Sequence, residues 1–186
     1  MHAFARIPKH LNKEKKILLI KTIIISQFNY SPLEWMFHIR TLNNKINKLH
    51  ERALRLVYKD ENLTFEELLH KDNSMTIHHR NIHKLAIEMY KVKNNISPKP
   101  FADIFENNMI PYDLRNKRHW EGGNVRTVLY GTETVRFRGP ETWAMVPQAI
   151  KDCESLKEFK NKIKTWNPDD CKCRLCKTFI PELGFI

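Results

Sequence analysis

The spacing of apolar residues along the chain predicts a mainly helical protein. Residues 14–30 are apolar nearly all round, which predicts a helix buried between neighbours, although the Ile-rich run could also form a strand. Pro32 ends or kinks this helix. Residues 42–58 are clearly amphipathic, because their apolar side chains share one face at a 3.6-residue period. That face consists of Leu42, Ile46, Leu49, Ala53, Leu56 and Val57.

Two helix-start signals follow. Thr64 and Glu67 form a capping box, which predicts a short helix to about residue 71. Ser74 or Thr76 is expected to begin a longer helix that ends near residue 94. The predicted core face of this longer helix is Ile82, Leu85, Ala86, Met89, Tyr90 and Val92.

The periodicity is weaker in the second half. Residues 98–120 are predicted to form a connector with one short helix at 101–105. Residues 125–129 and 134–138 alternate apolar and polar side chains on either side of a turn, which predicts a β-hairpin.

Two further helices are expected after this hairpin. Pro140 suits the first turn of one, and Ser155 is expected to cap the last. We therefore predict a mainly α chain: a helical bundle, then a small α+β part with one hairpin and a Cys-rich tail. The expected divisions are a helical domain at 1–96, a connector at 97–124 and a C-terminal domain at 125–186.

Composition adds a partner class. The chain of 186 residues has a net charge of +11, and such a surplus indicates a polyanionic partner, RNA or DNA before a membrane. The alternative is a soluble protein that is merely basic. The 41% of apolar residues can fill a core, so the chain is not of the disordered class.

The location expected from the sequence is intracellular, in the nucleus or cytoplasm. No apolar leader is evident, so secretion is not expected. The densest apolar run, 17–25, is far shorter than the ~20 residues that a membrane span needs. Reduced or metal-bound thiols follow from a reducing compartment.

A stripe of basic residues lies on the predicted helix 42–58. Lys45, Lys48, Arg52 and Arg55 recur at i, i+3, i+7 and i+10, so they share one flank. Cations along a rigid element can contact successive phosphates. The alternative is an ordinary solvated face, and Glu51 interrupts the positive field.

A second basic cluster lies on the helix that ends near residue 94. Arg80, Lys84 and Lys91 align opposite the core face, with His83 beside them, and are candidates for nucleic-acid contact. His79 and His83 have a metal-ligand spacing, but Arg80 stands where a metalloprotease has its glutamate, and its cation would repel a metal. A plain solvated face is the other alternative.

In the predicted hairpin, basic residues alternate with aromatic ones. Arg126, Arg136 and Arg138 are candidate contacts to a single strand, through charge and stacking on neighbouring rings. The alternative is a hairpin that packs Phe137 and Trp143 into a small core and leaves the arginines solvated.

The Cys-rich tail is a possible zinc site. Cys171, Cys173 and Cys176 lie within six residues, and Cys153 is a possible fourth ligand if the last helix folds back. No His follows them, so three reduced thiols on a terminal loop remain the alternative. No other cofactor is expected.

Signatures of an enzyme are lacking. The sequence has no Gly-rich phosphate loop, no G-x-S-x-G and no H-E-x-x-H. A nucleotidyl transferase needs clustered carboxylates for two metal ions, and none of the adjacent carboxylate pairs follows an apolar strand. Those pairs are Asp60-Glu61, Glu66-Glu67 and Asp169-Asp170. We therefore expect no catalytic activity from this chain alone.

Several segments together resemble one family, and any one alone would be weak. They are residues 11–60 with the run Phe28 to Phe37, 65–94, 112–116, 131–147 with the pattern Phe-x-Gly-Pro-x-x-Trp-x-x-Val-Pro, 155–164 and the Cys-rich tail. The chain is similar to the region after the catalytic palm in reverse transcriptases of non-LTR retrotransposons, the jockey-type LINE elements.

The resemblance implies a thumb and post-thumb region that grips an RNA–DNA template–primer duplex through its shape and phosphates. The parent enzyme would be an RNA-directed DNA polymerase, and its palm would be a partner within a longer protein. Fingers, palm, the paired catalytic Asp and the endonuclease are absent here, so polymerase activity is not carried over. A degenerate, inactive element copy and a helical protein-interaction module remain alternatives.

Overall fold

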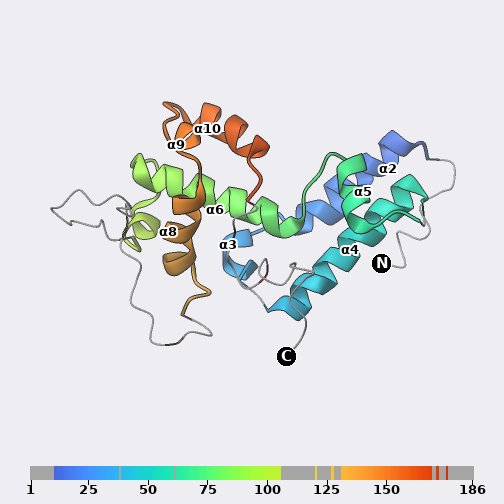
Figure 1. The fold of residues 1–186 in the computed structure, drawn as a ribbon, viewed down its shortest axis with the longest axis horizontal. Helices are drawn as coiled ribbons and strands as arrows, with labels where there is room; N and C mark the ends of the chain where they lie inside the picture. Colours follow the sequence, from blue (N-terminus) through green and yellow to red (C-terminus); the bar gives the residue numbers. More distant parts are fainter. Residues whose placement is uncertain are drawn as a thin grey trace. The chain divides into compact units, whose positions relative to one another are not determined.

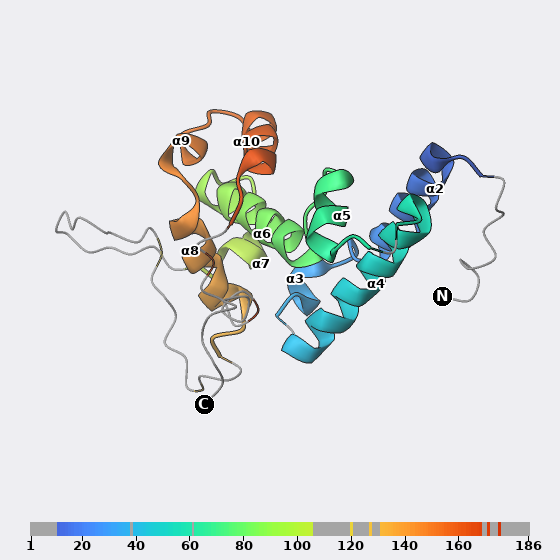
Figure 2. The same ribbon diagram turned by 45° about the vertical axis from the view of Figure 1, so that its right-hand side comes forward.

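The computed structural model describes residues 11–37, 39–60, 62–105, 120, 127, 131–168, 171 and 175. These residues form helices and the segments that join them, and none of them forms a strand. They group into two compact units, 1–80 and 81–186 (Figures 1 and 2). This division falls inside a helix, earlier than the boundary predicted from composition near residue 96.

The described residues of the first unit form four helical segments and a π-helical turn. They are α2 (Lys13–Leu19), the π-turn η1 (Ile20–Ile25), α3 (Pro32–Trp35), α4 (Arg40–Tyr58) and α5 (Phe65–Lys71). The helix α6 (Ile77–Lys93) begins in the first unit and continues into the second. The second unit also holds α7 (Lys99–Ala102), α8 (Val135–Met145), α9 (Gln148–Lys151), α10 (Leu156–Lys162) and the 3-10 turn η2 (Ile163–Thr165).

In the first unit, α4 lies between two small apolar clusters. One cluster joins Ala53 and Val57 of α4 to Ile20 and Ile25 of α2–η1, which runs alongside α4 in both ribbon views (Figures 1 and 2). The other joins Leu54 to the buried leucines of α5. Helix α4 is therefore buried on two adjoining sides and exposed on the rest of its circumference.

The helix predicted at 14–30 forms as α2 and η1, but it is not buried all round. Ile20 and Ile25 are buried, whereas the side chains of Leu18 and Ile23 are 62% and 45% exposed. The prediction of complete burial was wrong, because within this unit neighbours cover only one side of the helix.

The amphipathic helix at 42–58 is confirmed as α4, but its buried face is rotated from the expected one. Leu42 and Leu56 are 45% and 41% exposed, whereas Asn43, His50 and Leu54 are buried. Apolar periodicity alone missed this rotation, because the packing of α5 against Leu54 decides which side of α4 is covered.

The predicted helix starts are confirmed in their hydrogen bonds. The Thr64 backbone N–H donates to Glu67 Oε2 at 2.7 Å, and the Glu67 N–H donates to Thr64 Oγ1 at 3.3 Å, which completes the capping box. The N–H of His79 donates to Thr76 Oγ1 at 3.2 Å. The Glu158 N–H donates to Ser155 Oγ at 3.2 Å, so the last helix begins where the sequence predicts.

The second unit is built on aromatic packing around α6. All six residues of the predicted core face of α6 are buried. The Tyr90 ring stacks on Phe159 of α10 with centroids 4.3 Å apart, and Phe159 in turn lies 6.0 Å from Trp143 of α8. The Tyr90 hydroxyl donates to the carbonyl of Cys153 at 2.8 Å. These contacts fasten both α8 and α10 to α6.

The β-hairpin prediction was wrong where the structure tests it. Residues 134–138, its expected second arm, are the N-cap and first turn of α8, and the Arg138 N–H donates to the Thr134 carbonyl at 2.8 Å. Gly139, Pro140 and Trp143 of this helix are buried. Tertiary packing therefore overrides the strand preference of the short alternating pattern. Of the expected first arm, only Thr127 lies among the described residues.

Gly139 explains part of the Phe-x-Gly-Pro pattern. A Cβ atom at this position would lie 2.8 Å from Met89 Sδ and 2.9 Å from Phe105 Cε1. Both side chains are buried, so neither can move away easily. The glycine lets α8 approach the core closely.

We therefore predict that Gly139→Ala destabilises the chain by about 1–3 kcal/mol through overpacking, although alanine favours helix. Urea unfolding followed by circular dichroism measures this, with Ala144→Gly at an exposed position of α8 as a control for helix propensity. Unchanged or increased stability of Gly139→Ala would contradict the close packing.

Candidate nucleic-acid interface

The predicted stripe on α4 divides into exposed cations and one fastened arginine. Lys45, Lys48 and Arg52 are exposed, and none of them forms an ion pair with a residue that the structure describes. All three lie in one unbroken helix of 19 residues. Their backbone positions are therefore fixed relative to one another, as a phosphate-binding stripe requires.

Arg55, the fourth member, fastens the end of α4 to the loop that follows. Its Nη2 and Nε donate to Glu51 Oε1 at 2.6 and 3.0 Å. Its Nη1 donates to the carbonyl of Asp60 at 3.1 Å, and Nη2 donates to that of Leu63 at 2.9 Å. Glu51, which the sequence suggested would interrupt the field, is thus engaged by Arg55.

The basic residues of α6 that were predicted to contact nucleic acid are less exposed than expected. Arg80 is half-buried, burial lowers its pKa, and its Nε has no hydrogen-bond partner within the described part of the chain. Lys91 pairs with Glu88 at 2.7 Å. Lys84 is half-buried and keeps its place as a candidate contact.

His83 is a buried structural residue. Its Nε2 donates to the Trp166 carbonyl at 2.8 Å, and its ring stacks on Trp166 with centroids 5.6 Å apart. Burial lowers the pKa of His83, and the hydrogen bond to Trp166 opposes this only partly. The imidazole is therefore neutral at pH 7 and brings no positive charge to a phosphate.

The arginines expected on the hairpin have separate fates. Arg138 bridges Glu133 at 2.5 Å and Glu141 at 2.7 Å and is largely buried, so it stabilises the start of α8. Desolvation lowers the pKa of Arg138, but these carboxylates outweigh it and raise the pKa overall. Arg136 is exposed on α8. Arg126 lies outside the described residues.

The described residues include no cluster of ligands that supports the predicted zinc site. Cys153 is buried in the aromatic core of the second unit, where its packing accounts for it. Cys171 is buried as well, and Cys173 and Cys176 lie outside the described residues. No group of three or more metal-ligating side chains occurs in the part of the chain that the structure covers. Zinc at the tail stays a prediction.

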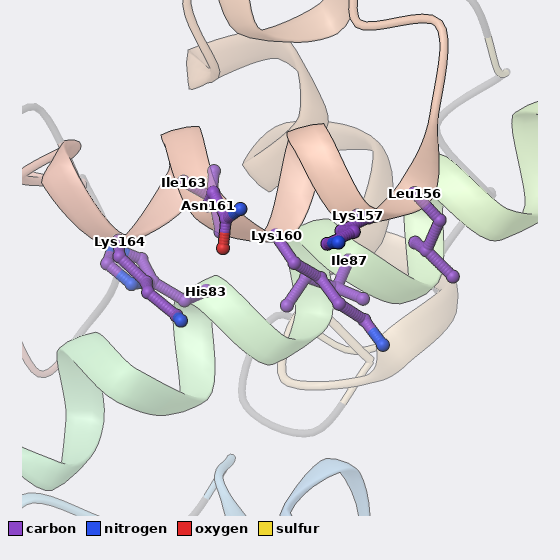
Figure 3. A pocket seen from close by; sticks show the side chains of 8 residues that line it. All are labelled: His83, Ile87, Leu156, Lys157, Lys160, Asn161, Ile163 and Lys164. Carbon is purple, nitrogen blue, oxygen red and sulfur yellow. The ribbon is translucent and has the colours of Figure 1, made fainter.

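Three lysines that the site prediction omitted line a groove in the second unit. Lys157, Lys160 and Lys164 come from α10 and η2 and line the groove together with His83 and Ile87 of α6 (Figure 3). Their spacing of i, i+3 and i+7 repeats that of the α4 stripe, so the same test would have found them. The sequence could not show that α10 packs against α6 at this place.

A buried polar cluster lies in the first unit. His50 of α4 is buried against the ring of Phe65, at a centroid distance of 5.6 Å. Burial and, to a smaller extent, the Arg80 cation lower the pKa of His50, Asp72 partly opposes them, and the resulting pKa is about 4. Asp72 also accepts a hydrogen bond from the Tyr58 hydroxyl at 2.9 Å.

Comparison with known proteins identifies no relative of this chain. No protein-family model, no curated protein and no solved structure matches the chain. Separately, no helix among the described residues is long and apolar enough to cross a membrane.

The contrast between Arg55 and Arg52 can be measured. Arg55→Ala leaves the carbonyls of Asp60 and Leu63 without this donor and should destabilise the chain by about 1–3 kcal/mol. Arg52→Ala, its matched control one turn earlier on the same helix, should change stability little. Equal urea midpoints for the two variants would refute the structural role of Arg55.

His50 should make stability depend on pH. Its pKa is lower in the folded chain than its ordinary value of 6.5, so the unfolded chain binds the proton more readily between pH 6.5 and about 4. Stability should therefore fall as the pH falls through this range, by about 3 kcal/mol from this group. Urea unfolding at successive pH values should show a shallower fall for His50→Gln; an identical slope would contradict the assignment.

Proposed function

We propose that this chain binds nucleic acid through phosphate contacts, as the thumb and post-thumb region of a non-LTR retrotransposon reverse transcriptase. The observation that carries the proposal is the row of exposed cations on α4. Lys45, Lys48 and Arg52 lie on one rigid helix, and no described carboxylate neutralises them. The assignment to a thumb region rests on the resemblance of the sequence to that family.

The contact expected from these residues is electrostatic. Lysine is a compact, flexible cation that suits phosphate oxygens and does not by itself distinguish bases. A thumb grips the template–primer duplex by its backbone, and a row of cations on one helix serves that purpose. The proposed partners are RNA, an RNA–DNA hybrid or DNA.

The chain by itself is proposed to be non-catalytic. Support comes from the sequence, which has no carboxylate pair placed after an apolar strand. Synthesis would then depend on the palm of a longer protein.

A second proposal concerns that palm. Several large apolar side chains of residues 18–30 are exposed, among them Leu18 and Ile23 of α2–η1 and Tyr30, which is 82% exposed. Isolated exposed apolar residues are ordinary, but several on one short segment favour a protein partner. A neighbouring polymerase domain would cover them.

The hybrid-binding proposal predicts a specific loss on charge reversal. Lys48→Glu with Arg52→Glu should weaken binding of a 12-base-pair RNA–DNA hybrid about tenfold or more at low salt. It should also reduce the slope of log affinity against log salt by about 2. Fluorescence anisotropy over a salt series measures both quantities.

Lys15→Glu with Lys21→Glu is the matched control, because it makes the same change in net charge at exposed lysines of α2 and η1. It should lose much less affinity. Equal losses in the two double variants would mean that net charge alone drives binding. Unchanged affinity in the α4 variant would remove the thumb proposal and leave the protein-docking one.

A further inference from the structure

A groove lies between α6 and the α10–η2 segment in the second unit (Figure 3). Its volume is about 570 Å³, within the range of ligand sites. Helix α6 contributes His83 and Ile87, and the remaining lining comes from α10 and η2: Leu156, Lys157, Lys160, Asn161, Ile163 and Lys164. Every lining residue belongs to the second unit.

The groove carries positive charge that no lining residue neutralises. Lys157, Lys160 and Lys164 are exposed, and no carboxylate is among the eight residues that form its walls. Glu158, the acidic residue on α10, pairs instead with Lys162 at 2.7 Å. The cations of α10 thus sort into one paired with Glu158 and others that border the groove. An anionic ligand matches this arrangement.

Apolar side chains also line the groove. They are Ile87, Leu156 and Ile163, and Figure 3 shows Ile87 of α6 next to Lys157 and Lys160. A simple inorganic anion would gain nothing from this surface. A nucleotide unit offers both partners, because its phosphate is anionic and the face of its base is apolar.

The bases of a duplex are stacked within it, so only a single strand can turn a base face toward such a surface. The lysines also extend further than one nucleotide. From Lys157 to Lys164 the segment rises about 10 Å, so the three ammonium groups cannot all contact a single phosphate. The row can therefore contact two or more successive phosphates.

We propose that this groove binds single-stranded nucleic acid, with Lys157, Lys160 and Lys164 on consecutive phosphates and an unstacked base against Ile87 and Leu156. Asn161 offers an amide that can donate to and accept from the base edge. His83 is neutral and held by Trp166, so it forms a fixed wall and adds no charge. The groove shares no residue with the α4 stripe, so this proposal goes beyond the duplex contact proposed above.

The test uses the full chain and fluorescein-labelled 12-nucleotide oligo(U) and oligo(dT) in anisotropy titrations at several salt concentrations. Lys160→Glu with Lys164→Glu should weaken binding of the single strands about tenfold and reduce the salt slope by about 2. The control is Lys93→Glu with Lys99→Glu, an equal change in charge at exposed lysines within the second unit but outside the groove, and it should lose less than about twofold. Circular dichroism establishes that each variant is folded.

Three results would overturn the proposal. The first is equal loss of affinity in the groove and control variants. The second is unchanged affinity in a folded groove variant. The third is that UTP or inorganic phosphate displaces the labelled oligonucleotide at the same concentration at which unlabelled oligo(U) displaces it. That result would show a site for a small anion instead.

The two proposals fail separately. Loss of single-strand binding in the groove variant, with unchanged hybrid binding in the α4 variant, would remove the thumb and keep the groove. The reverse pattern would keep the thumb and remove the groove.

Discussion

The second unit depends on the stacking of Tyr90 on Phe159. This pair joins the last turn of α6 to the middle of α10, and Trp143 extends the same stack to α8. Aromatic pairs of this kind add about 0.5–1.5 kcal/mol each beyond the area they bury. The Tyr90 hydroxyl also holds the carbonyl of Cys153, just before α10 begins. The groove exists because these contacts hold α10 at a fixed place over α6.

The cations of this chain divide according to their chemistry. Arg55 and Arg138 each engage two or more acceptors, which suits a planar guanidinium with several donors. The groove, by contrast, is lined with lysines, and two of the three exposed members of the α4 stripe are lysines. The arginines hold loops and helix ends, and the exposed cations are suited to phosphates. On the proposed function, such surfaces would position a polynucleotide without reading its sequence.

Two proposed surfaces, one in each unit, suit different forms of nucleic acid. The α4 stripe lies along an exposed helix face, which suits the backbone of a duplex. The groove adds an apolar lining, which a duplex cannot use because its bases face one another. A protein that handles a template–primer meets both forms, since the template is single-stranded where it has not yet been copied.

Local chemistry made part of the fold predictable. The capping box at Thr64, the cap at Ser155 and the core face of α6 depend on residues within a few positions of one another, so the sequence determined them. The exposure of Lys45, Lys48 and Arg52 was predictable for the same reason, because charged residues on the polar flank of a helix remain in solvent.

Tertiary packing decided the rest. Residues 134–138 alternate like a strand, yet they begin α8 because Gly139 and Trp143 must reach the core. His83 was expected to contact nucleic acid, yet Trp166, distant in sequence, covers it. Hydrophobic periodicity fixes which segments become helices, since it acts within a few turns. Which face of α4 is covered, and which lysines come to border a groove, depends on neighbours far along the chain, and only the folded structure brings these together.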